Sequence, residues 1–164
     1  MKWQTNEPLG PYINHWGCHF CSILQKVERK SGGKFKWTNE QIVDVYENAM
    51  SWGYLSPEVQ KDGKPYDGCT VMHGDKIFNL AAEYAGIEAR AKGYRHEEWN
   101  YQPNANEEEI LELKRDGYAG SHFVSGDNVA NQKPWTKEIE YDGIEGGSRC
   151  AQEGWIASKR ILSF

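Results

Sequence analysis

A chain of 164 residues, 38% of them hydrophobic, is long enough to bury one core, and we expect a single domain over residues 1–164. The net charge of −5 argues against a broad nucleic-acid surface, because phosphate binding needs a concentrated positive field. No segment approaches the roughly 20 apolar residues that span a bilayer, and the N-terminal residues lack the apolar centre of a signal peptide. We therefore expect a cytoplasmic protein without a nucleic-acid or membrane partner.

Three helices are predicted in the first half of the chain. Apolar residues at helical spacing predict the first helix over about 18–30, where a run of small residues ends it. A capping box of Thr38 with Gln41 begins the second helix, which ends at Gly53. The third helix is predicted over about 74–85.

Strands dominate the second half of the prediction. We expect a short strand at 88–92 and then a short acidic helix at 107–115. Three further strands follow, at 121–125, 136–141 and 155–162. Helices followed by strands predict an α+β fold, in which the N-terminal helices pack on a small antiparallel sheet.

Cys18 is predicted to begin the first helix, directly after Gly17, which gives the chain freedom to turn. The positive end of the helix dipole favours thiolate over thiol at this position. His122 lies in a predicted strand, where a rigid backbone can hold an imidazole as base for that thiolate. The competing interpretation is a buried cysteine and a core histidine, each common in folded proteins.

A catalytic histidine needs a third group that accepts its second N–H. Asp142 is the favoured candidate because it ends the strand predicted to pair beside the His122 strand, while Asp127 reads more naturally as part of a hairpin turn. The backbone N–H of the helix-leading cysteine can stabilise an oxyanion. Asn14 and Tyr12 are weaker side-chain candidates for the same role.

Two other kinds of site are compatible with the same cysteines. The spacing of Cys18 and Cys21 also suits a thioredoxin-like redox motif, but residues 1–17 do not predict the strands that precede such a motif. His15 and His19 could complete a zinc site with them, although four ligands so close in sequence would be cramped. We expect no metal and no cofactor, and we expect Cys21 to pack in the core.

The order of a cysteine-led helix, two more helices, a Ser-His-Phe-Val strand and a strand ending in Tyr-Asp-Gly resembles papain-like cysteine peptidases. The similarity is greatest to their bacteriocin-processing, double-glycine-peptidase-like branch. Residues 17–27 and 120–143 also look similar to an uncharacterised family of small spirochaete and phage proteins. The resemblance implies a papain-like fold in which Cys18 is the nucleophile, His122 the base and Asp142 the orienting residue.

The sequence leaves two functions open. The first is a cysteine hydrolase, which forms an acyl-enzyme from a peptide or another acyl-bearing substrate. The second is a non-catalytic binding or inhibitory protein of a mobile element on the same scaffold. The state of Cys18 separates them, because catalysis needs an accessible thiol with a lowered pKa within hydrogen-bond reach of His122.

Overall fold

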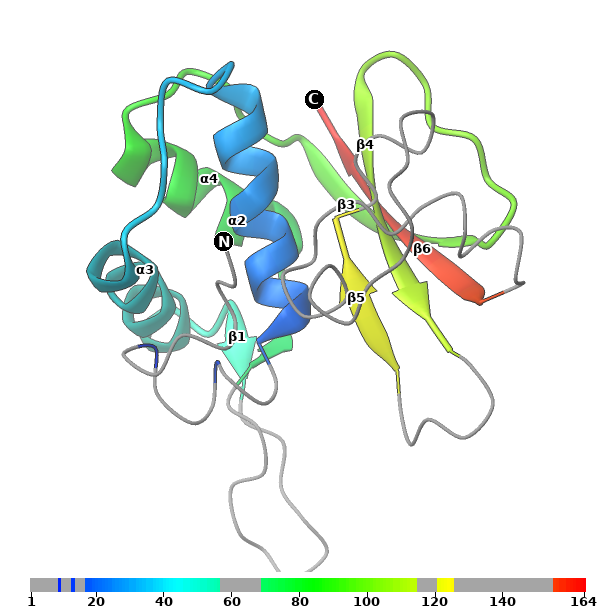
Figure 1. The fold of residues 1–164 in the computed structure, drawn as a ribbon, viewed down its shortest axis with the longest axis horizontal. Helices are drawn as coiled ribbons and strands as arrows, with labels where there is room; N and C mark the ends of the chain where they lie inside the picture. The colour runs from blue at the N-terminus through cyan, green and yellow to red at the C-terminus, as the bar shows by residue number, and fades with distance from the viewer. Residues whose placement is uncertain (1–8, 10–12, 14–16, 57–68, 115–120, 126–154) are drawn as a thin grey trace, which may run out of the picture.

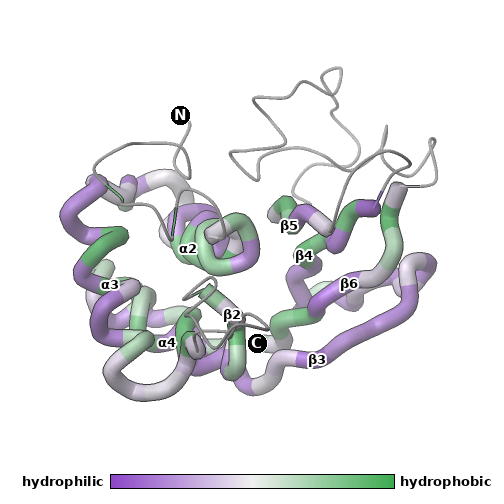
Figure 2. The backbone as a smooth tube through the Cα atoms, turned by 90° about the horizontal axis from the view of Figure 1, so that it is seen from below, coloured by the Kyte–Doolittle hydropathy of each residue, from purple (hydrophilic) through white to green (hydrophobic). Residues whose placement is uncertain are grey.

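The computed structural model describes residues 9, 13, 17–56, 69–114, 121–125 and 155–164. Within these residues, helices lie on one side of a four-stranded antiparallel sheet, and a two-stranded sheet lies near the helices (Figure 1, Figure 2). This arrangement confirms the predicted α+β class, with N-terminal helices packed on a small antiparallel sheet.

Helix α2 (Cys18–Lys30) has the predicted bounds and lies between the sheet and the other helices (Figure 1). Its apolar residues recur at helical spacing and form one buried stripe. The stripe residues are fully buried: Phe20, Ile23, Leu24 and Val27. Burial of this stripe, rather than a side-chain N-cap, stabilises the helix, because Gly17 offers no capping side chain.

Helices α3 (Asn39–Ser51) and α4 (Gly74–Ala85) also agree with the prediction. The Thr38 hydroxyl accepts a hydrogen bond from the Gln41 N–H, and the Gln41 side chain accepts one from the Thr38 N–H. Gly86 ends α4 with a φ of 70°, which glycine adopts without steric cost. In the described part of the chain, no helix is both long and apolar enough to cross a membrane.

The strands form two sheets within the described residues. The small sheet pairs β1 (Leu55–Ser56) with β2 (Thr70–Val71). The large sheet has the order β3-β6-β4-β5, and its strands are β3 (Gly93–Glu98), β4 (Glu107–Leu113), β5 (His122–Val124) and β6 (Ile156–Ser163). The predicted strands 121–125 and 155–162 are thus confirmed, while 136–141 lies outside the described residues.

The acidic helix predicted at 107–115 is wrong, because residues 107–113 form β4. Its glutamates pair with cations on other strands and on α2 rather than along a helix. Glu107 contacts Arg95 at 2.5 Å, and Glu109 contacts Lys159 at 2.8 Å. Cross-strand ion pairs and burial between two strands outweigh the helical propensity of glutamate, which is a weak preference.

The strand predicted at 88–92 is also wrong, because β3 begins at Gly93. The Asn79 side chain of α4 bonds the backbone of Ala91 instead. Its amide nitrogen donates to the Ala91 carbonyl at 3.0 Å, and its oxygen accepts from the Ala91 N–H at 2.7 Å. A helix side chain therefore satisfies backbone groups that a neighbouring strand would otherwise satisfy.

The two faces of the large sheet carry different residues. The register pairs Glu112 with Phe123 and Leu111 with Val124, so Phe123 and Val124 point to opposite faces. Phe123 packs against the core shared with the helices. Val124 joins Leu111 and Leu113 in a second cluster on the other face. The side of β5 on which a residue lies therefore decides whether it faces α2.

Candidate functional site

The turn before α2 fixes Cys18 as the first residue of that helix. The Gly17 N–H donates to the Ile13 carbonyl oxygen at 2.9 Å. A Cβ on Gly17 would lie 2.5 Å from the same oxygen, which is closer than real side chains approach. Gly17 has a φ of −81°, so glycine is required here for close backbone contact rather than for conformational freedom.

The thiol of Cys18 is half-buried between the start of α2 and strand β5. Burial raises its pKa above the ordinary 9.0, while the backbone N–H groups of Phe123, His19 and Cys18 itself lower it, and the Glu112 carboxylate raises it further. The net shift is upward, so the thiol is protonated at neutral pH. The same N–H groups are nevertheless placed to stabilise negative charge once a proton is removed.

His19 is a site residue that the sequence suggested only as a zinc ligand. Its ring stacks on Phe123 with a centroid distance of 4.0 Å and an interplanar angle of 7°. Its Nε2 forms a hydrogen bond with the Tyr94 hydroxyl. Burial, helped by the nearby positive charge of Arg160, lowers the pKa of His19 to about 3, so the imidazole is neutral.

His122 is the first residue of β5 and is 5% exposed. It pairs with Leu113, and the alternation of the strand places it on the face of Val124, opposite Phe123 and α2. The fold thus brings the Cys18 thiol to the backbone of the residue next to His122. The His122 side chain, however, points to the face of β5 opposite the one that α2 and Cys18 meet.

The other predicted site residues fall outside the described residues. These are the orienting candidate Asp142, its rival Asp127, and the oxyanion candidates Asn14 and Tyr12. Their roles stay predictions. Of the proposed oxyanion donors, the backbone N–H of Cys18 lies within the described residues, at the start of α2.

Charged residues of the sheet lie beneath the start of α2. Arg160 of β6 bonds Glu112 of β4 at 3.2 Å, and its guanidinium lies 5.5 Å from the centre of the Phe123 ring. The sequence pattern did not reveal this pair, because the segment that holds Glu112 was expected to be a helix. The strand register places Tyr94, Arg160 and Glu112 on the same, helix-facing side of the sheet, on three different strands.

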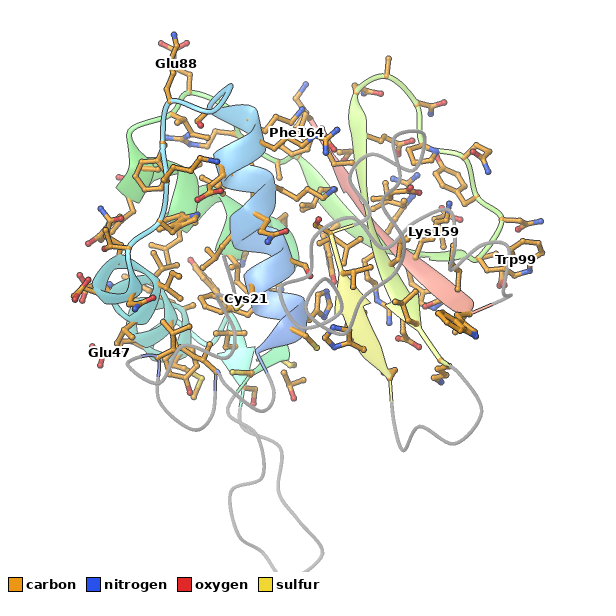
Figure 3. All side chains as sticks on the ribbon, in the orientation of Figure 1. Cys21, Glu47, Glu88, Trp99, Lys159 and Phe164 are labelled. Atoms are coloured by element: carbon orange, nitrogen blue, oxygen red, sulfur yellow. The ribbon has the colours of Figure 1, made fainter. Side chains whose placement is uncertain are left out.

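Cys21 of α2 is 1% exposed and packs in the hydrophobic core, as predicted (Figure 3). Across the described ranges, no three or more His, Cys, Asp or Glu side chains gather where they could hold a metal ion. The reactive groups described at this site are the Cys18 thiol, the neutral His19 imidazole and polar side chains of the sheet such as Glu112.

A sequence family described as "Protein of unknown function, DUF261" matches residues 1–164, and the chain belongs to this family. No curated protein and no solved structure matches the chain.

Proposed function

We propose that this member of the DUF261 family is a cysteine hydrolase of the papain-like kind, with Cys18 as nucleophile and His122 as general base. One observation carries the proposal: the thiol at the start of α2 lies against the backbone N–H of Phe123, the residue next to His122. A nucleophile at a helix N-terminus beside a strand that carries a histidine is an arrangement that thiol catalysis can use.

The reaction follows from these roles. His122 removes the thiol proton, and the Cys18 sulfur attacks the carbonyl carbon of a peptide or another acyl-bearing substrate. The backbone N–H of Cys18 stabilises the oxyanion. The imidazolium returns the proton to the leaving group as its bond to the carbonyl carbon breaks. Water, deprotonated by His122, then attacks the thioester carbonyl carbon, the C–S bond breaks, and the imidazolium returns its proton to the departing Cys18 sulfur. Asp142 orients the imidazole.

The proposal requires a rearrangement at the start of β5. His122 lies on the face of the strand that points away from α2, so its imidazole has to reach the strand edge at which Cys18 lies. When this requirement is met, the imidazolium beside Cys18 lowers the pKa of the thiol, reversing the effect of burial.

The test is the alkylation rate of each cysteine against pH, located by mass spectrometry, in the wild type and in His122→Ala. We expect Cys18 of the wild type to react rapidly below about pH 8 and to lose this behaviour in His122→Ala, because only the thiolate is nucleophilic. Cys21, buried in the core, is the internal control and should react slowly in both proteins. Identical Cys18 profiles in the two proteins would contradict the proposal.

A second candidate, the non-catalytic binding protein, is favoured by a different observation. Burial raises the pKa of Cys18, and His122 lies on the face of β5 opposite the one that meets α2, so His122 does not lie beside the thiol in the described conformation. This function predicts a Cys18 that reacts slowly at neutral pH and does not depend on His122. Retention of partner binding by Cys18→Ser would support it further.

A further inference from the structure

His19 connects the start of α2 to the strands of the sheet. Its ring lies parallel to that of Phe123 in β5, with centroids 4.0 Å apart, and its Nε2 bonds the Tyr94 hydroxyl of β3. It directly follows Cys18, so these two contacts tie the backbone that carries the thiol to the strand whose Phe123 N–H faces that thiol.

Tyr94 is itself held in place by the helix layer. A Cβ on Gly74, the first residue of α4, would lie 2.6 Å from the Tyr94 ring, so glycine allows the two to pack in direct contact. The hydroxyl of Tyr94 therefore offers His19 a fixed hydrogen-bond partner, because the ring that carries it is packed against a helix N-terminus.

We propose that His19 is the positioning residue of this site: its stack on Phe123 and its bond to Tyr94 set the contact between the Cys18 thiol and the Phe123 N–H. The inference deepens the proposed function and rests on Cys18 being its reactive thiol. His19 acts by geometry and not by charge, because its imidazole stays neutral above a pKa of about 3. No proton transfer by His19 is involved.

The direction of the effect follows from the hydrogen bond that His19 preserves. The Phe123 N–H lowers the pKa of the Cys18 thiol, so loss of that contact raises it. Removal of the Tyr94 hydroxyl leaves the ring in place and keeps the thiol covered, but frees the His19 ring to shift. A change that merely opened the site to water would act in the opposite direction, because burial raises the thiol pKa.

The experiment measures the pH midpoint of Cys18 alkylation in Tyr94→Phe. We expect the midpoint to rise by about half a pH unit or more, the size of a lost hydrogen bond to a thiolate. Tyr84→Phe is the matched control, because the Tyr84 hydroxyl bonds Asp44 at the surface and the same atom is removed there. The control should keep the wild-type midpoint, and circular dichroism confirms that both variants are folded.

A double-mutant cycle with His19→Phe tests whether the two residues act together. Phenylalanine retains the stack on Phe123 but loses Nε2, so His19→Phe should raise the midpoint as Tyr94→Phe does. The double variant should shift no further than either single variant, because both remove one hydrogen bond. Fully additive shifts would overturn the positioning role, and so would an unchanged or lowered midpoint in folded Tyr94→Phe. Should Tyr94→Phe fail to fold, His19→Phe alone decides in the same way.

Measuring His122→Ala alongside separates this inference from the proposed function. A midpoint that responds to Tyr94→Phe but not to His122→Ala supports positioning by His19 and contradicts the hydrolase. A midpoint that responds to His122→Ala but not to Tyr94→Phe supports the hydrolase and overturns the role of His19.

Discussion

Single residues set the local geometry of the backbone through contacts that composition does not reveal. Gly17 is needed because the backbone of Ile13 passes too close for a side chain. Gly86, in contrast, is needed because of its left-handed φ, since a Cβ there would meet nothing within 4 Å. The two glycines therefore respond to the same substitution for different physical reasons.

Alanine at these two positions separates steric contact from backbone strain. We expect Gly86→Ala to lower the free energy of unfolding by roughly 1–2 kcal/mol, the cost of a left-handed alanine. Gly17→Ala should cost more, about 2–4 kcal/mol, and should also change Cys18 alkylation, because the start of α2 has to move. Urea unfolding of both variants measures the difference. Wild-type alkylation in a stable Gly17→Ala protein would contradict this account of the turn.

At the scale of elements, β4 illustrates how pairing overrides local preference. Its glutamates face cations on other strands and on α2, and Glu107 makes several polar contacts. Its carboxylate accepts from the Tyr101 hydroxyl at 2.6 Å and from the Asn104 N–H at 3.0 Å, and it contacts Arg95 at 2.5 Å. These bonds lower the pKa of Glu107 to about 2.

This shift predicts a pH dependence of stability. Because the folded pKa lies below the ordinary 4.5, the contribution of Glu107 is fully present above that value and is lost as the pH falls through about 2. The urea midpoint of the wild type should therefore fall more between about pH 5 and pH 2 than that of Glu107→Gln. Glu98→Gln, at an exposed position of β3, serves as control and should follow the wild type. Parallel curves for wild type and Glu107→Gln would show that the bonds contribute no pH-dependent stability.

At the scale of the whole molecule, a buried cation links the helix layer to the sheet. Lys26 of α2 is 1% exposed and lies 3.7 Å from Glu108 of β4. Lys30, one turn later, contacts the other oxygen of Glu108 at 3.3 Å and is 27% exposed. Both lysines meet the same carboxylate, but Lys26 is buried, while Lys30 is partly exposed and also lies 4.1 Å from the centre of the Phe164 ring.

That difference in burial predicts unequal effects on stability. Lys26→Ala should lower the free energy of unfolding by about 2–4 kcal/mol, because it removes a buried partner and its packed aliphatic stem. Lys30→Ala, the matched control, should cost about 1 kcal/mol or less, as partly exposed ion pairs do. Denaturant unfolding of the two variants gives the comparison. Equal costs would mean that burial does not decide the strength of this connection.

The sequence by itself determined the elements whose signals are local. The stripe of α2, the capping box of α3 and the glycine that ends α4 depend on residues within a few turns of one another, and all three helices have their predicted bounds. The position of Cys18 at a helix start, and of His122 in a strand, followed from the same local patterns.

Tertiary structure decided what local patterns do not contain. Whether 107–113 is helix or strand depended on pairing with residues outside the segment, such as Lys159 of β6, and the start of β3 depended on the Asn79 side chain of α4. The contact of His19 with Tyr94 joins residues that are 75 positions apart. The face of β5 that carries His122 is set by its pairing with β4, because a strand shows one side to α2 and the other away from it. The spacing of residues along a strand determines which side chains share a face, and pairing with distant strands determines which part of the molecule that face contacts.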